Sequence, residues 1–193
     1  MDLCMGYRNL VASVYPNFQK QKVCKEVLIM PSFQMLIGLP GSGKSSWIKE
    51  QHDRHSTFYK FTILSTDNHI EEHAKERGIT YNEAFKSYIG IAETTMGFDL
   101  NYAIQNRNNI IWDQTNLTEK VRKKKLAKIP RYYTKEAIVF LTQYDIIKKV
   151  NEDRKTFGRA LPDHILESMV KNFDISTIES EGFDKVTKIT RSV

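Results

Sequence analysis

One short glycine-rich segment limits the fold of this chain more than any other feature. Residues 38–45 read GLPGSGKS and fit the pattern G-x-x-x-x-G-K-[ST]. The segment follows an apolar run at residues 33–37, which predicts a strand, and it precedes a run that predicts a helix over about residues 44–54. In such a unit, glycines let backbone N–H groups converge on phosphate oxygens, and the helix N-terminus adds positive potential. The segment therefore predicts a phosphate-binding loop within an α/β fold.

The chemistry expected of this loop assigns roles to individual side chains. Lys44 is expected to reach the β and γ phosphates of a nucleotide, and the Ser45 hydroxyl is expected to bind Mg²⁺. The alternative is a glycine-rich turn at a helix start, but the strand–helix context agrees with the motif. The nucleotide-binding residues predicted on this basis are Gly38, Pro40, Gly41, Ser42, Gly43, Lys44, Ser45 and Ser46.

The rest of the chain alternates between short apolar runs and longer amphipathic ones. Strands are predicted at residues 33–37, 61–64, 109–112 and 136–141, with a last edge strand at 186–189. Helices are predicted at residues 44–54, 68–77, 80–105, 118–128 and 145–156, and from Pro162 onward. Strands that alternate with helices imply a parallel sheet covered on both faces. The expected fold class is α/β, a P-loop NTPase-type parallel sheet flanked by helices with a short helical lid.

Composition narrows the class of protein further. The 193 residues are 40% hydrophobic and carry a formal net charge of +6, which predicts a soluble globular protein with a polyanionic partner. No stretch approaches the roughly 18 apolar residues of a membrane helix, so we expect no membrane partner and a cytoplasmic location, in the host cytoplasm if the chain is phage-encoded. Cys4 and Cys24 form no CxxC pattern, which argues against a disulfide framework and a cysteine zinc site.

The beginning of the chain differs from the remainder. Residues 1–32 mix aromatic and polar side chains without a helical or strand period. We expect them to form an extension that is disordered or not translated, followed by one kinase-type domain over residues 33–193. Met30 lies a few residues before the first strand, so a chain that begins there is expected to keep full activity.

Other motifs select among the reactions that such a loop can support. No N-K-x-D motif is present, which argues against a GTPase, and Gln114 follows Asp113 where a hydrolysing motor usually has glutamate. A kinase instead needs a base for an acceptor hydroxyl, and Asp67 follows the strand at residues 61–64, on the sheet edge of the phosphate loop. The alternative for Asp67 is an N-cap of the following helix.

A kinase also needs arginines that close over the transferring phosphoryl group. Arg154 and Arg159 flank a short loop between two predicted helices, as in a lid that folds over ATP. The alternative is a pair of surface arginines that solvate the loop.

These motifs together resemble the polynucleotide kinase group of P-loop kinases, known from phage and DNA-repair enzymes. The resemblance runs through residues 39–47, 65–67 and 113–117, Arg122, Arg154, Arg159 and residues 181–183. It implies ATP and Mg²⁺ as cofactors, with Lys44 and Ser45 at the nucleotide, Asp67 as the base, and Arg154 or Arg159 on the phosphates. It also implies acceptor binding by Asp113, Thr115, Asn116 and Arg122, with Asp113 close to the metal and Arg122 on the substrate backbone.

This sequence departs from the group's pattern at two positions. The phage enzyme has an arginine three residues after its aspartate that grips a 3′-phosphate of the acceptor, and Ile70 stands there in this chain. Gln114 is inserted between Asp113 and Thr115, a D-Q-T-N form that is also similar to the kinase-like segment of certain nuclear RNA-binding proteins. A D-x-D-G-T sequence is absent, so a phosphatase half is not expected.

A basic run comes after the D-Q-T-N segment. It comprises Lys120, Arg122, Lys123, Lys124, Lys125, Lys128 and Arg131, without an acidic residue among them. Either this is a solvated helix face, or it is a track for the phosphates of an acceptor strand.

Two other signals, a zinc-like pattern and a pair of tryptophans, have simpler structural explanations. Residues 69–73 formally match the zinc pattern H-x-x-E-H, yet they lie on the helix that follows the proposed base, so surface histidines are the simpler interpretation. Trp47 and Trp112 are expected to pack in the core rather than to stack on bases.

From these residues we predict an ATP- and Mg²⁺-dependent kinase that phosphorylates a hydroxyl of a nucleic acid, in the first instance a 5′-hydroxyl end of DNA or RNA. One alternative is a kinase that acts on a modified base in DNA, a nucleoside or a small metabolite. A second alternative is a non-catalytic P-loop module that binds nucleic acid.

Overall fold

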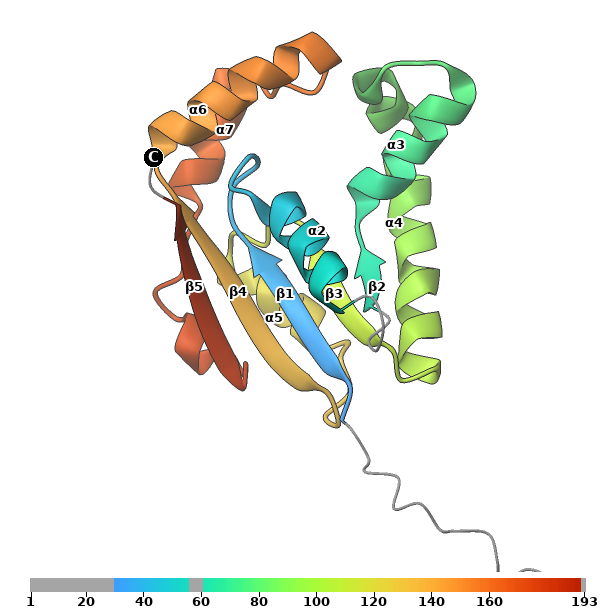
Figure 1. The fold of residues 1–193 in the computed structure, drawn as a ribbon, viewed down its shortest axis with the longest axis vertical. Coiled ribbons are helices and arrows are strands. Elements are labelled where there is room, and N and C mark those ends of the chain that lie inside the picture. The colour runs from blue at the N-terminus through green and yellow to red at the C-terminus, as the bar shows by residue number, and fades with distance from the viewer. Residues whose placement is uncertain (1–29, 56–60, 192–193) are drawn as a thin grey trace, which may run out of the picture.

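A five-stranded sheet forms the centre of the computed structural model, which describes residues 30–55 and 61–191. The strands are β1 (Ser32–Ile37), β2 (Phe61–Leu64), β3 (Asn109–Asp113), β4 (Thr134–Thr142) and β5 (Lys185–Arg191). They follow the order β2-β3-β1-β4-β5, and every neighbouring pair is parallel (Figure 1). The predicted parallel sheet is therefore confirmed.

The helices agree closely with the predicted ranges. They are α2 (Lys44–His55), α3 (Thr66–Arg77), α4 (Tyr81–Gln105), α5 (Glu119–Leu126), α6 (Tyr144–Asp153) and α7 (Asp163–Lys171), with short 3-10 turns η2 (Arg154–Phe157) and η3 (Ile178–Ser180). The helix predicted over residues 145–156 ends earlier, because its last turn tightens into η2 and closes at Gly158 in a left-handed conformation. Pro162 caps α7 instead of forming its first residue.

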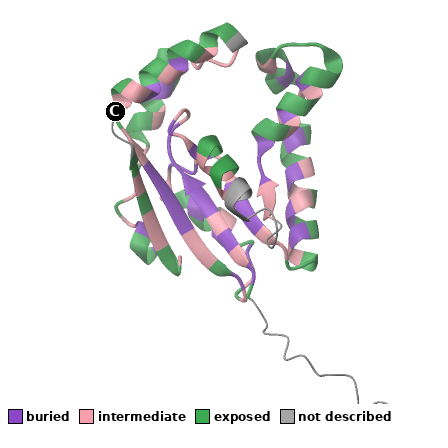
Figure 2. Cartoon of the chain, in the orientation of Figure 1, coloured by how far each residue is buried: buried purple, intermediate pink, exposed green. Residues whose placement is uncertain are grey.

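The two faces of the sheet bury different apolar clusters. Alternate residues of β1 point to opposite faces, as the strand period requires. Leu36 packs with α2 through Trp47, whereas Phe33, Met35 and Ile37 pack with α4 and α5. Figure 2 shows that burial is concentrated in the central strands and on the inner sides of these helices. The expectation of helices on both faces is confirmed. Trp112 is in the core as predicted, only 2% exposed, whereas Trp47 is partly buried and packs against Phe140.

Helices α3 and α4 form an antiparallel pair that projects beyond β2 (Figure 1). The pair is held by small and branched apolar residues, including Ile70, Ala74 and Ala84. Thr80 and Glu83 form the predicted capping box at the start of α4. Ile70, which stands where the phage enzyme has arginine, is fully buried in this helix contact.

The beginning of the described chain is already part of the domain. β1 starts at Ser32, and the Pro31 carbonyl accepts a hydrogen bond from the Thr134 N–H at 3.0 Å. The predicted boundary after residue 32 therefore lies slightly too late. Residues 1–29, the greater part of the predicted extension, lie outside the described residues. Among the helices that are described, none combines the length and apolar character needed to cross a bilayer.

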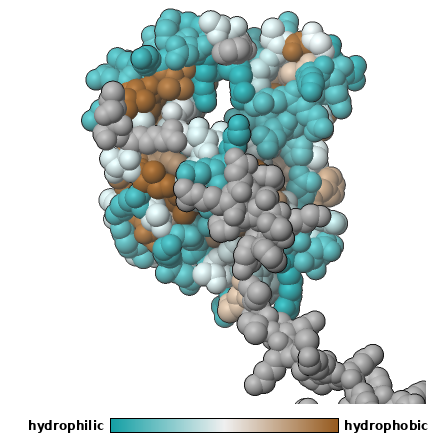
Figure 3. Space-filling view, in the orientation of Figure 1, coloured by the Kyte–Doolittle hydropathy of each residue, from teal (hydrophilic) through white to brown (hydrophobic). Residues whose placement is uncertain are grey.

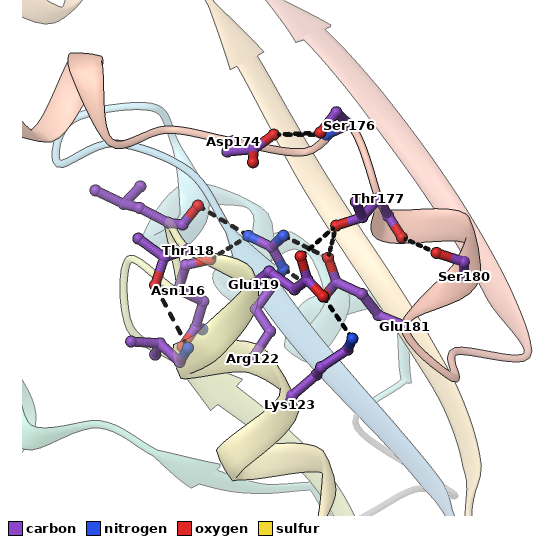
Figure 4. Close-up of polar contacts among 12 residues, drawn as sticks. Asn116, Thr118, Glu119, Arg122, Lys123, Asp174, Ser176, Thr177, Ser180 and Glu181 are labelled. Carbon is purple, nitrogen blue, oxygen red and sulfur yellow. Dashed lines mark hydrogen bonds and ion pairs between the residues drawn. The ribbon is translucent and has the colours of Figure 1, made fainter.

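Arg122 has a structural role that corrects its predicted contact with a substrate backbone. Its guanidinium is fully buried and donates to both carboxylate oxygens of Glu181, at 2.7 and 2.6 Å. The remaining nitrogen donates to the carbonyls of Asn116 and Leu117 at 3.1 and 2.8 Å (Figure 4). Because all three guanidinium nitrogens have partners and the side chain is fully buried, Arg122 cannot reach an acceptor. It fastens α5 to the D-Q-T-N segment and to η3.

We expect Arg122→Met to lower the free energy of unfolding by about 3–5 kcal/mol, because it leaves Glu181 as an uncompensated buried charge. Denaturant unfolding of the variant measures this loss. Replacing both partners in Arg122→Met/Glu181→Met should recover much of it. Lys123→Met, which breaks an exposed pair with Glu119 on the same helix, is the matched control and should leave the unfolding midpoint nearly unchanged. A loss in Lys123→Met equal to that in Arg122→Met would contradict this account.

Candidate active site

The loop between β1 and α2 has the backbone that phosphate binding requires. Gly41 and Gly43 adopt φ values of 82° and 97°, which other residues rarely tolerate. Gly38 donates its N–H to the Thr115 carbonyl at 3.0 Å, which ties the start of the loop to the D-Q-T-N segment. All eight predicted nucleotide-binding residues lie in this loop or in the first turn of α2.

Lys44 is buried at the centre of this loop. Its Nζ donates to the carbonyl oxygens of Gly38 and Leu39, both at 2.9 Å. Burial lowers the pKa of Lys44 from 10.5 to about 8, Arg154 contributes to this, and the carboxylates of Asp113 and Asp67 oppose it. Ser42 Oγ is also buried and has no hydrogen-bond partner among the described residues. An ammonium held only by carbonyls and an unsatisfied hydroxyl fit an anionic phosphate chain at this loop.

A cavity of about 800 Å³ opens beside the loop, at the carboxyl ends of β2 and β3. Parallel α/β sheets bind their ligands at this edge. Asp67, Asp113, Arg154 and Arg159 all line the cavity. Its other walls are partly apolar and come from α4, α5, α7 and the segments that precede α5 and α7, with residues Phe85, Leu117, Val121, Leu161, Ile165 and Met169. Figure 3 shows the surface hollowed between α3 and the arch of α6 and η2.

Two carboxylates of different character face this cavity. Asp67 is exposed in the first turn of α3 and accepts a hydrogen bond from the Tyr81 hydroxyl at 2.8 Å. Ser65, rather than Asp67, is the N-cap of α3, so the capping alternative for Asp67 is wrong. Asp113 ends β3 in a half-buried position, where burial raises the pKa of its carboxyl, Asp67 adds to the rise and Lys44 opposes it. Asp67 is thus the more accessible of the two carboxylates.

The predicted lid arginines come from η2 and from the loop after it. Arg154 is half-buried, and burial together with the nearby Arg159 lowers its pKa. Arg159 pairs with Glu71 of α3 at 2.6 Å and lies 4.6 Å from the centre of the Tyr81 ring. Through Arg159, the loop that follows η2 therefore contacts both α3 and α4. These contacts differ from those of arginines that only solvate a loop.

A hydrogen-bond network organises the D-Q-T-N segment. Gln114 Nε2 donates to Thr66 Oγ1 at 3.1 Å, and Gln114 Oε1 accepts from the Trp112 indole at 3.0 Å and from Lys125. Asn116 is buried with a φ of 51°, and its Nδ2 donates to the Leu36 carbonyl at 2.7 Å. Asparagine tolerates this left-handed conformation better than most residues. The inserted Gln114 therefore links β3 to the residue that precedes Asp67.

The residues fit a magnesium ion bound together with a nucleotide. Ser45 is exposed in the first turn of α2, and Asp113 ends the adjacent strand. Within the described parts of the chain, no group of three or more histidine, cysteine or acidic residues could hold a metal by itself. Mg²⁺ commonly takes one or two protein ligands plus phosphate oxygens and water, so this sparse donor set suits it.

The residues of the zinc-like pattern at 69–73 each contact a different partner. His69 Nε2 lies 2.8 Å from Asp99, and His73 stacks on Tyr88 with ring centres 4.0 Å apart. Glu71 pairs with Arg159. These residues join α3 to α4 and to the lid.

The structure brings most of the predicted site residues together. Asp67, Asp113, Thr115, Asn116, Arg154 and Arg159 line one cavity, and the charges of Lys44, Asp67, Asp113 and Arg154 influence one another. Arg122 is the exception. Tyr81 and Phe85 are among the cavity side chains that the sequence analysis missed. The capping box could have indicated them, because it places the first turn of α4 close to that of α3.

This combination of sheet order, glycine-rich loop and carboxylate-lined cavity defines a P-loop NTPase fold of the kinase type. The chain belongs to the AAA domain family, whose match covers residues 34–175.

Solved structures of known proteins share the fold at low sequence identity. The PezAT toxin–antitoxin system of Streptococcus pneumoniae matches with a TM-score of 0.60 and 14% identity, covering 99% of this chain and 78% of that one. The Pnkp1/Rnl/Hen1 RNA repair complex matches with a TM-score of 0.59 and 17% identity, covering 82% of this chain and 49% of the other. Shikimate kinase from Acinetobacter baumannii, in complex with shikimate, matches with a TM-score of 0.53 and 12% identity, covering 84% and 86%. These similarities establish the fold.

We expect nucleotide affinity to depend on pH through Lys44. Phosphates stabilise the ammonium, so the affinity for ADP should be constant below the pKa of about 8 and fall above it, to roughly tenfold weaker at pH 9 than at pH 7. Calorimetric titration with ADP at several pH values measures this.

The control is Lys44→Arg, which stays charged over the whole range, so any affinity that it retains should be nearly independent of pH. A loss of folded protein at high pH would not explain the fall in ADP affinity, because Lys44 affects stability in the opposite direction. The folded pKa lies below the unfolded one, so between about pH 8 and 10.5 the unfolded chain binds more protons and this group makes the folded state more stable as pH rises. An equal pH dependence in Lys44→Arg would contradict the role of Lys44.

Proposed function

We propose that this protein is an ATP- and Mg²⁺-dependent kinase that transfers the γ-phosphoryl group to a hydroxyl of a nucleic acid, at a 5′-hydroxyl end of DNA or RNA. The observation that carries the proposal is the position of Asp67. Its carboxylate is exposed to a cavity that adjoins the phosphate loop. Arg154 and Arg159 line the same cavity. A base in this position suits an acceptor hydroxyl.

The proposed reaction is an in-line phosphoryl transfer. The acceptor oxygen forms a bond to the γ phosphorus, the bond from that phosphorus to the β–γ bridging oxygen breaks, and ADP leaves. Asp67 takes the proton of the acceptor hydroxyl, while the Tyr81 hydroxyl holds one of its oxygens in place at 2.8 Å. Lys44 stabilises negative charge on the phosphates, and the lid arginines exclude water.

Ser45 and Asp113 would hold the magnesium ion, which supplies charge neutralisation on the phosphates when bound. Burial raises the pKa of the Asp113 carboxyl, so this side chain gains from a cationic partner. Asp113 and Asp67 thereby take separate roles, one toward the metal and one toward the acceptor.

The charge distribution supports a nucleic-acid acceptor. Of the basic run, Arg122 and Lys125 are turned inward and Lys123 pairs with Glu119. The exposed lysines Lys120, Lys124 and Lys128 are four residues apart and follow one side of α5 and the turn after it. Since Val121 of the same helix lines the cavity, these lysines lie close to a path toward Asp67.

A kinase for a smaller hydroxyl acceptor is the second candidate, and the cavity itself favours it. The walls from α4, α5 and α7 are partly apolar, and the position of the phage arginine is filled by the buried Ile70. A nucleoside or a small metabolite would suit such walls. A non-catalytic binding module suits the site less well, because Lys44 and Asp67 are both retained beside the cavity.

We expect replacement of Lys120, Lys124 and Lys128 by Gln to weaken binding to single-stranded nucleic acid. Each lost phosphate contact reduces the slope of log affinity against log salt by about 0.7, so the triple variant should lose about 2. Binding titrations at several salt concentrations measure the slope, and the affinity for ATP should not change. An unchanged slope would show that these lysines only solvate the helix.

We expect Asp67→Asn to reduce phosphoryl transfer by about 10²-fold or more, because the amide cannot accept the hydroxyl proton. The side chain keeps an oxygen for the Tyr81 hydroxyl, and Ser65 caps α3, so the melting temperature and the ATP affinity should barely change. Single-turnover transfer to a 5′-hydroxyl oligonucleotide is the measurement, since it isolates the chemical step.

Glu72→Gln is the matched control, because Glu72 is an exposed carboxylate on the same helix that does not line the cavity. It should keep wild-type turnover. An Asp67→Asn variant that retains more than about a third of the wild-type rate would place the base elsewhere.

A further inference from the structure

Lys125 is a cation of the cavity wall to which the proposed mechanism gives no role. It belongs to α5, where the helical period turns it inward beside Val121, away from the exposed lysines of the same helix. Its Nζ donates to the side-chain oxygens of Gln114 and Asn116 and lies 5.1 Å from the centre of the Trp112 ring. An ammonium has three N–H donors, so one more is available beyond these two partners.

The electrostatic situation of Lys125 is similar to that of Lys44. Burial lowers the pKa of Lys125 from 10.5 to about 7, with Lys128 contributing and Glu93 opposing. Among the described residues, neither lysine forms an ion pair with a carboxylate, and both are held by neutral oxygens. Two other buried or half-buried cations nearby do have such partners, Arg122 with Glu181 and Arg159 with Glu71. For Lys44 the missing anion is the phosphate chain of the nucleotide.

We propose that Lys125 binds an anionic group of the acceptor, a phosphate or a carboxylate, and so selects acceptors that carry an anion near the reacting hydroxyl. The proposal rests on the proposed function for its link to catalysis. The hydrogen bonds of Gln114 support a short distance between the anion at Lys125 and the reacting hydroxyl at Asp67. Gln114 accepts from Lys125 through one end of its amide and donates to Thr66 through the other, and Asp67 follows Thr66 directly.

The rest of the cavity restricts the body of this acceptor. Phe85, Val121 and Ile165 present apolar surface on the other walls, which favours a ring or a compact carbon skeleton over a second charged group. Both a nucleotide unit of a nucleic acid and a small hydroxy acid combine such a body with one anion. The two sources share the chemistry that Lys125 would recognise.

Matched pairs of acceptors test the proposal and separate the two sources. Calorimetry in the presence of Mg²⁺ and a non-hydrolysable ATP analogue compares thymidine with thymidine 3′-monophosphate, and glucose with gluconate. We expect the wild-type protein to bind one of the anionic members about 10- to 100-fold more tightly than its neutral partner, the effect of one charge-assisted hydrogen bond. The pair that shows the preference identifies the source of the anion.

Three variants assign the preference to Lys125. Lys125→Met should reduce it to within about twofold, and Lys125→Arg should keep most of it because the charge remains. Lys123→Met, which removes an exposed lysine of the same helix that pairs with Glu119, should keep all of it. If Lys125→Met does not fold, Lys125→Gln removes the charge and keeps a hydrogen-bond donor for Asn116.

The proposal is overturned if the wild-type protein binds neither anionic compound more tightly than its neutral partner, or if the preference persists in Lys125→Met. It is also overturned if Lys125→Met weakens both members of a pair equally, because Lys125 would then only position Gln114 and Asn116. Phosphoryl transfer is measured separately on the same compounds. A Lys125-dependent preference without any transfer would reject the proposed kinase function and leave the anion site in place.

Discussion

The buried ammonium of Lys44 is the constraint on which the rest of this site depends. A cation inside a protein is costly unless it is paired, and here it is held by two loop carbonyls while its pKa falls to about 8. The surrounding structure reduces this cost without removing it. Asp113 ends β3, the strand beside β1, and Asp67 lies in the first turn of α3, directly after β2. Both carboxylates therefore contribute negative potential from the same sheet edge. The loop is therefore ready for a phosphate chain, and the parallel sheet order places the candidate base beside it.

The far side of the cavity depends on a second buried cation. Arg122 uses its ion pair with Glu181 and two carbonyls to fix α5 against the D-Q-T-N segment. This fixed position directs Val121 and Lys125 into the cavity and leaves Lys120, Lys124 and Lys128 on the outside. One basic helix thus contains a structural arginine, a cavity lysine and a row of exposed lysines, and the proposals for the acceptor assign different roles to the last two.

Much of this arrangement could be predicted from the sequence, because it arises from local patterns. The phosphate loop, the five strands and the capping box at Thr80 each have a short-range signature with a physical cause. The burial of Arg122 could not be predicted in this way, because Glu181 lies 59 positions along the chain and its acidic side chain had no evident partner. Lys125 could not be distinguished from the neighbouring lysines of α5 either, for a different reason. Which lysine of a basic run faces inward depends on the register of the helix against the sheet, and composition does not report register.

The central claim is that the phosphoryl group goes to a hydroxyl acceptor rather than to water. The most direct measurement is incubation of the wild-type protein with γ-labelled ATP and Mg²⁺, with and without 5′-hydroxyl oligonucleotides of DNA and RNA, nucleosides and small hydroxy acids. The account predicts label in at least one acceptor, at the oligonucleotide end for the proposed function, with one ADP formed for each label transferred. Label found only in inorganic phosphate, at a rate that no acceptor changes, would contradict it.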